Sequence, residues 1–137
     1  MAYEIRVSDD GAYIVLKVTG ATGRTGLAQV VEAHALGAKL GIRRYLVDLT
    51  EATNPDPPSQ SYEFAYGDFP ATPGIDRFAS VAALVSPGDH SHDFLVTVFQ
   101  NSGSTIGLFD DREAALRHLL ASHPPAPRDP SGSSSLI

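Results

Sequence analysis

The stretch Arg43-Arg44-Tyr45-Leu46-Val47-Asp48-Leu49-Thr50 decides the fold that we predict for this 137-residue chain. It is a short apolar run that ends abruptly in polar and proline-rich sequence. Apolar residues fall on both faces of an extended chain here, which is typical of a central parallel strand covered by helices on both sides. The loop at residues 51–58 then leaves the carboxyl end of that strand, where open α/β sheets usually place their sites.

The sequence before this strand predicts a hairpin and a crossover helix. Residues 3–7 and 12–18 flank the turn Asp9-Asp10-Gly11, which is typical of a β-hairpin. Apolar residues then recur at helical intervals from Leu27, and Gly41 ends that helix just before the central strand. This strand, helix and strand form a crossover unit, and such units are right-handed.

The sequence after the central strand predicts two more strands and three more helices. Residues 59–68 favour a weak helix, residues 78–85 a buried strand and residues 104–109 a last short strand. Residues 94–100 fit either a helical face or a β-branched strand, and we favour the helix. The predicted order is ββαβαβαβα: an α/β fold, a single layered domain with a mixed, mostly parallel five-stranded sheet, an N-terminal hairpin and about four helices.

The end of the chain predicts a clear helix and then a tail. Asp110 followed by Glu113 indicates a capping box, and Leu116 and Leu119 lie on one face of the helix that follows. Residues 122–137 are rich in proline and serine and hold few residues that could form a core, so we expect a flexible tail beyond a domain at 1–121.

Composition narrows the classes of function. The chain has 10 Lys plus Arg against 16 Asp plus Glu, and its basic residues are scattered, which argues against a nucleic-acid or anionic-membrane surface. It has no cysteine, so disulfides, thiolate metal sites and a cysteine nucleophile are excluded. No apolar run approaches the ~18 residues of a membrane span, and the first residues lack the pattern of a signal peptide, so we expect a cytoplasmic protein.

Polar residues give little support for catalysis or metal binding. His90 and His92 would face the same side of an extended segment, but they diverge on a helix, and we predict neither a metal nor a cofactor. His34 falls near the apolar stripe of the first helix and is expected to be a buried, hydrogen-bonded histidine. Asp48 is better placed for chemistry, yet a carboxylate there more often accepts backbone N–H bonds from a neighbouring loop. The sequence also lacks a Gly-x-Ser-x-Gly elbow, so we predict that the protein is not an enzyme.

An aromatic segment follows the proline-rich loop. Its residues Tyr62, Phe64, Tyr66 and Phe69 sweep around a helix and cannot all face the core. The surplus could line a small apolar pocket together with Asp48, or it could form a patch for self-association.

The order of elements resembles the STAS-like group of bacterial proteins related to anti-sigma-factor antagonists, in particular its uncharacterised branch. The stretch Tyr45–Leu49 at the third strand and the stretch Ile106–Leu120 at the end carry this resemblance, which covers roughly residues 3–121. The resemblance implies a mixed sheet with helices packed on it. It also implies a non-enzymatic regulatory domain with a protein partner, or one that self-associates.

The resemblance also implies a modification site. Classical members are phosphorylated by a partner kinase on a serine at the start of the helix after the central strand, in an Asp-Ser-Ser-Gly type sequence. The corresponding stretch here is Asp56-Pro57-Pro58-Ser59-Gln60-Ser61, in which Ser59 and Ser61 are the nearest serines and the adjoining Ser and Gly are missing. The alternative reading is that Ser59 is an ordinary solvated residue of a first helical turn.

A distant likeness of the family to lipid-transfer folds implies a second function. In this alternative, the chain binds a small apolar ligand or lipid through residues 62–69 and the loop after the central strand.

Overall fold

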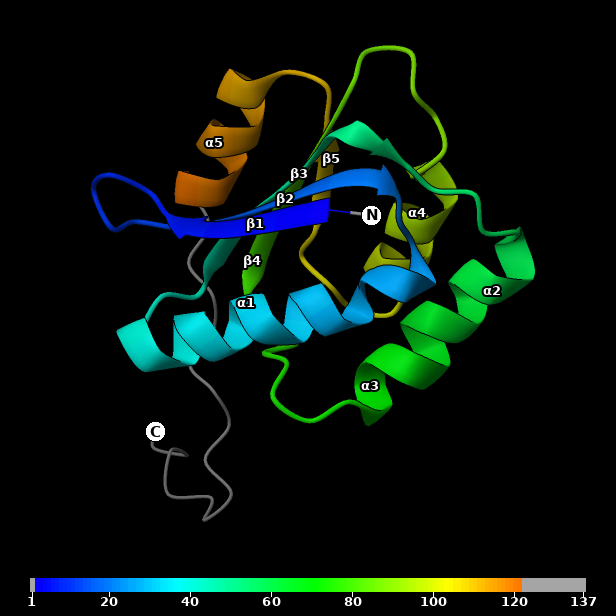
Figure 1. Ribbon diagram of the computed structural model, residues 1–137, viewed down its shortest axis with the longest axis horizontal. Helices are drawn as coiled ribbons and strands as arrows, with labels where there is room; N and C mark the ends of the chain where they lie inside the picture. The colour runs from blue at the N-terminus through cyan, green and yellow to red at the C-terminus, as the bar shows by residue number, and fades with distance from the viewer. Residues whose placement is uncertain (1, 122–137) are drawn as a thin grey trace.

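A five-stranded mixed sheet forms the centre of the computed structural model, which describes residues 2–121 (Figure 1). The strands lie side by side in chain order: β1 (Ala2–Val7), β2 (Ile14–Ala21), β3 (Arg44–Thr53), β4 (Ser80–Val85) and β5 (Gly107–Phe109). β1 and β2 form the expected antiparallel hairpin, and every other neighbouring pair is parallel. The predicted single α/β domain with a mostly parallel sheet is therefore confirmed. The tail predicted at 122–137 lies outside the described residues.

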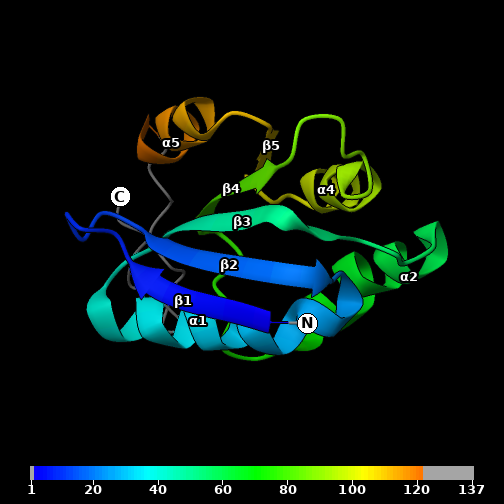
Figure 2. The same ribbon diagram turned by 45° about the horizontal axis from the view of Figure 1, so that its top comes forward.

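Helices connect and cover the strands. They are α1 (Leu27–Leu40), which follows the 3-10 turn η1 (Arg24–Gly26), then α2 (Pro58–Glu63), η2 (Phe64–Asp68), α3 (Phe69–Ala71), α4 (Asp93–Asn101) and α5 (Arg112–Ala121). Because each parallel strand is added on the same side of the last one through a right-handed crossover, the crossover helices share one face of the sheet. α5 follows the last strand and covers the opposite face from α1 (Figure 2).

β3 is the central strand, as the sequence predicts, and both of its faces are buried. Tyr45 pairs with Ile14 on one side and Val81 on the other, and it faces the layer that contains α1. Leu46, the next residue, points to the other face and packs with Leu119 of α5. Tyr45 is 3% exposed and Leu46 is 0% exposed, so neither face of this strand is open to water.

Close packing of α1 on the sheet depends on a glycine. A Cβ atom at Gly37 would collide with the hydroxyl of Tyr45 and would lie 2.7 Å from the carbonyl oxygen of Ile42. The helix ends four residues later at Gly41, which has φ +72° and donates its N–H to the Gly37 carbonyl. Any larger residue at position 37 would move the helix away from β3.

The segment after the proline-rich loop differs from the single helix predicted at 59–68. The chain forms a short α-helix, passes into the wider π-helical turn of η2, and continues as α3 through Pro70. At the end of η2 the N–H of Phe69 donates to the carbonyl of Phe64, five residues earlier. Gly67 therefore does not stop the helical path, because a wider turn carries the chain past it.

Two other expectations concern the helices α4 and α5. The helix favoured at 94–100 is confirmed as α4. The capping box predicted at Asp110 and Glu113 is wrong by one residue, because α5 begins at Arg112 and Asp111 precedes it. The Oδ2 atom of Asp111 accepts the N–H of Ala114 at 3.2 Å, which is the cap that the sequence placed on its neighbour.

Truncation of Leu119 to alanine is predicted to lower the free energy of unfolding by roughly 2 to 5 kcal/mol, because this side chain is fully buried between α5 and the sheet. Leu116→Ala should cost less, since Leu116 is only partly buried. The matched control is Leu120→Ala, which removes a largely exposed side chain of the same helix. Chemical denaturation of the three variants measures the differences, and equal losses for Leu119 and Leu120 would contradict the packing of α5.

Candidate functional site

The candidate site is built on the segment from α2 to α3, where aromatic residues divide between the surface and the core. Tyr62 and Tyr66 point outward and are 55% and 42% exposed, and their ring centroids lie 4.6 Å apart. Phe64 is buried and points inward, and Phe69 is partly buried beside it. The expected surplus of aromatic surface is therefore real and consists of the two tyrosines.

Ser59 lies on the same side of the helix as the tyrosines. It is exposed and precedes Tyr62 by three residues, which places both side chains on one face of α2. We call the exposed set of Ser59, Tyr62 and Tyr66 the tyrosine ridge. Ser61, the other serine predicted as a modification site, is only 2% exposed, so a kinase could not reach its hydroxyl without local unfolding.

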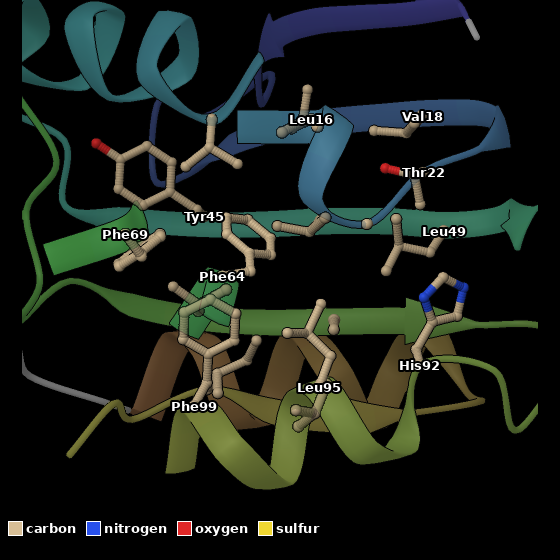
Figure 3. Close-up of a pocket in the computed structure, with 18 of the residues that line it drawn as sticks. Leu16, Val18, Thr22, Tyr45, Leu49, Phe64, Phe69, His92, Leu95 and Phe99 are labelled. Carbon is tan, nitrogen blue, oxygen red and sulfur yellow. The ribbon is translucent and has the colours of Figure 1, made fainter. Parts of the chain in front are cut away.

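The inward side of this segment borders a cavity of about 140 Å³ between the sheet and the helical layer (Figure 3). Its walls come from β2, β3, β4, α1 and α4, and they are almost entirely apolar. Three phenylalanines meet edge to face at one end: the centroid of Phe69 lies 4.9 Å from Phe99 and 6.2 Å from Phe64, and Phe64 lies 5.6 Å from Phe99. We call this space the core cavity.

Thr22 and His92 lie at the other end of the core cavity (Figure 3). The Nε2 atom of His92 lies 3.1 Å from the carbonyl oxygen of Ala52 and so donates its proton to β3, and Asp89 lies 3.5 Å from the same nitrogen. The backbone N–H of Thr22 donates to the carbonyl of Thr53 at 2.8 Å. These bonds fix the carboxyl ends of β2 and β3 to the start of α4.

The residues that the sequence predicts to line one pocket thus lie in different places. Phe64 and Phe69 line the core cavity, whereas Tyr62 and Tyr66 form the outer surface of the same segment. Asp48 faces the opposite side of the sheet and does not line the core cavity. Ordinary helical spacing separates Phe64 from Tyr62 and Tyr66, whereas the inward position of Phe69 depends on the π-helical turn, which the sequence does not mark.

Asp48 has a local structural role. Its Oδ1 atom accepts the N–H of Thr50 at 3.0 Å and the Thr50 hydroxyl at 2.7 Å. The sequence predicts that a neighbouring loop donates backbone N–H bonds to Asp48, whereas the donor in the structure is Thr50 of the same strand. Both hydrogen bonds join Asp48 to Thr50 within β3, so this carboxylate stabilises the local conformation of the strand.

His90 and His92 diverge, as expected for the start of a helix. His90 is exposed and its Nδ1 atom lies 2.9 Å from Asp93, whereas His92 is buried. Among residues 2–121, no group of three histidine or carboxylate side chains could hold a metal ion.

His34 is the buried, hydrogen-bonded histidine that the sequence predicts. Its Nδ1 atom accepts the backbone N–H of Asp76 at 2.9 Å, and its ring stacks on Tyr45 with centroids 4.3 Å apart. Burial lowers the pKa of His34 to about 4, against the opposing charge of Asp76, and burial raises the pKa of Tyr45 to about 12. Arg43 pairs with Asp76 at 2.6 Å, so the loop before β4 is held against α1 and β3.

Solved structures share this arrangement of sheet and helices. An anti-sigma factor antagonist from Mycobacterium paratuberculosis superposes with a TM-score of 0.53 at 10% identity, over 86% of this chain and 94% of that one. An uncharacterised DUF3478-family protein with a SpoIIAA-like fold, from Shewanella loihica, gives 0.51 at 18% identity, over 86% and 92%. The anti-sigma factor antagonist SpoIIAA in its unphosphorylated form gives 0.50 at 13% identity, over 85% and 94%.

The chain has a STAS-like fold. No family model matches the sequence, and no curated protein matches it either. At these identities the likeness is one of fold, and the site must be argued from its own residues. In this STAS-like fold the tyrosine ridge lies on the segment that follows β3, and the core cavity lies beneath it.

Acid is predicted to destabilise the protein through His34. Because the folded state holds this histidine neutral and its pKa falls from 6.5 to about 4, the unfolded chain binds more protons between these values. The stabilisation that comes from keeping His34 neutral is fully present above pH 6.5. It is lost as the pH falls toward 4, and the free energy of unfolding then decreases by about 3 kcal/mol.

The control for this prediction is His34→Gln, which keeps a hydrogen-bond acceptor without a proton that titrates in this range. Urea denaturation of both proteins at several pH values between 7 and 4 gives the difference in slope that belongs to His34. The same pH dependence in both proteins would contradict a buried, neutral His34.

Proposed function

We propose that this chain is a regulatory, non-enzymatic domain that binds a protein partner in the cytoplasm through the tyrosine ridge. The shared fold supports this proposal, since two of the solved structures are described as anti-sigma factor antagonists. The observation that carries it is the exposed, adjacent pair of Tyr62 and Tyr66 on the segment after the central strand. None of the helices in residues 2–121 is long and apolar enough to cross a bilayer.

Two neighbouring exposed tyrosines are well suited to a protein interface. Each presents a broad apolar ring together with a hydroxyl, and aromatic residues are enriched at the centres of interfaces. The segment that carries the ridge is held in place from the inside, because its phenylalanines pack edge to face in the core. Binding of a partner would therefore cost little conformational entropy, because this surface is already ordered.

Phosphorylation of Ser59 is the regulation that we propose for this surface. Ser59 is exposed and lies one helical turn before Tyr62, so a phosphate there would add about −1.5 to −2 charges beside the aromatic contact. SpoIIAA is described in an unphosphorylated form, which supports a modification of this kind in that protein. Burial of Ser61 leaves Ser59 as the residue that we propose.

The proposal of a non-enzymatic role is supported by the hydrogen bonds of the polar residues that could have served in catalysis. Asp48 is bonded to Thr50, His92 donates to Ala52, and His34 accepts a backbone N–H. Each of these polar groups is bonded within the fold, and Asp48 lies on the opposite face of the sheet from His34 and His92.

A photo-crosslinking amino acid at position 62 or 66 tests the proposed interface in the native cell. We expect both positions to give a protein adduct of one defined mass, because both side chains would lie within the contact. The same amino acid at position 94 is the matched control, since Phe94 is 46% exposed on α4 but is not part of the ridge. The Ser59→Asp variant should reduce the adduct at position 62 at least several-fold, and Ser59→Ala should preserve it.

The adduct is identified by mass spectrometry, which separates a different protein from a second copy of this chain. Absence of any adduct at positions 62 and 66, or equal adducts at position 94, would contradict the ridge as an interface. An adduct that Ser59→Asp leaves unchanged would contradict phosphorylation control while leaving the interface in place.

A further inference from the structure

We propose that the core cavity is a binding site for a small aromatic molecule that carries one polar group. This inference is independent of the tyrosine ridge, because the ridge faces solvent and the cavity lies on the inner side of the segment. It shares Phe64 and Phe69 with the ligand site expected from the sequence, but Asp48, Tyr62 and Tyr66 take no part in it.

The size of the core cavity supports an occupant. Protein interiors are packed as densely as organic crystals, with few voids larger than a water molecule. The core cavity, at about 140 Å³, is close to the size of apolar cavities that stay dry and take up benzene. Its floor is the face of the sheet formed by Leu16, Val47 and Ala83, and α1 and α4 form side walls that leave it partly open.

The aromatic end of the cavity favours a ring over a flexible chain. Phe64, Phe69 and Phe99 already meet edge to face, and a further ring can join such a cluster with the same geometry. A long acyl chain would need a longer tunnel than about 140 Å³ allows. The space therefore fits a compact molecule of roughly six to ten non-hydrogen atoms.

The other end supplies one polar contact. The Nε2–H of His92 is already directed to the carbonyl of Ala52, so this donor is engaged by the fold. Thr22 is buried, lines the cavity, and is held in place through its backbone bond to Thr53. A threonine hydroxyl can donate or accept, so Thr22 can bond a hydroxyl or an amine on the ring.

Binding of benzene by the full chain is the first test. We expect benzene to raise the thermal midpoint of unfolding in a saturable way, by on the order of 5 °C near its limit of solubility in water. Methyl NMR should show shifts at Val47, Leu49 and Leu95, which line the cavity, and none at Leu46 and Leu119 on the other face. No saturable change, or equal shifts on both faces, would overturn the proposal.

Two neighbouring residues of β4 provide matched variants. Ala83→Val adds two methyl groups inside the cavity, whereas Ala82→Val adds them on the opposite face of the same strand. We expect Ala83→Val to weaken benzene binding at least tenfold and Ala82→Val to preserve it. Equal binding of benzene by both folded variants would overturn the site. If a variant fails to fold, the methyl NMR shifts of the unaltered protein decide whether benzene binds in the cavity.

Comparison of phenol with benzene tests the polar end. We expect phenol to bind about threefold to tenfold more tightly than benzene, which is the usual net effect of one added hydrogen bond. Thr22→Val should remove this advantage and leave benzene binding unchanged, since valine has nearly the shape of threonine. Equal binding of the two compounds, or an advantage that survives Thr22→Val, would overturn the assignment of Thr22.

Discussion

The structure depends on the burial of β3 on both of its faces. A strand in this position must satisfy its backbone through neighbours on each side, and β3 does so with parallel partners in β2 and β4. Its side chains then alternate between the helical layer and α5, so Tyr45 and Leu46 belong to different parts of the core. The core cavity lies on one face of this strand, and the segment that carries the tyrosine ridge follows its carboxyl end.

The aromatic segment turns that placement into two distinct surfaces. The π-helical turn at 64–68 lets the chain direct phenylalanines inward and tyrosines outward within a few residues. The inner side closes the core cavity, and the outer side carries the tyrosine ridge. The two proposed sites therefore lie on opposite sides of one segment.

Much of the fold could be predicted from the sequence because its signals are local. The apolar run at 45–49, the turn glycine at 11 and the C-terminal glycine of α1 each determine one element through backbone geometry, and all three agree with the structure. The predicted cap of α5 is wrong by one residue because the sequence has two adjacent aspartates, Asp110 and Asp111, and either residue could cap a helix. Only the three-dimensional start of the helix selects Asp111.

The candidate site was less predictable, since it depends on which residues share a face. A regular helix at 59–68 already places Tyr62 and Tyr66 on one face and Phe64 on the opposite face, but its continuation would place Phe69, seven residues after Tyr62, on the tyrosine side. The π-helical turn instead brings Phe69 to the side of Phe64, five residues earlier, and no residue type marks this turn in the sequence. The core cavity was equally hidden, because a space between layers is set by residues that are distant in the chain, such as Leu16, Ala83 and Leu95.

Amide hydrogen exchange along β3 measures whether this strand is held in the interior of the domain. If this strand is held in the interior by neighbours on both sides, its amide protons from Tyr45 to Leu49 exchange only when the whole domain unfolds. The amides of β1 at the edge of the sheet should exchange faster, because this strand pairs on one side alone. Exchange in β3 that is as fast as in β1 would contradict the account.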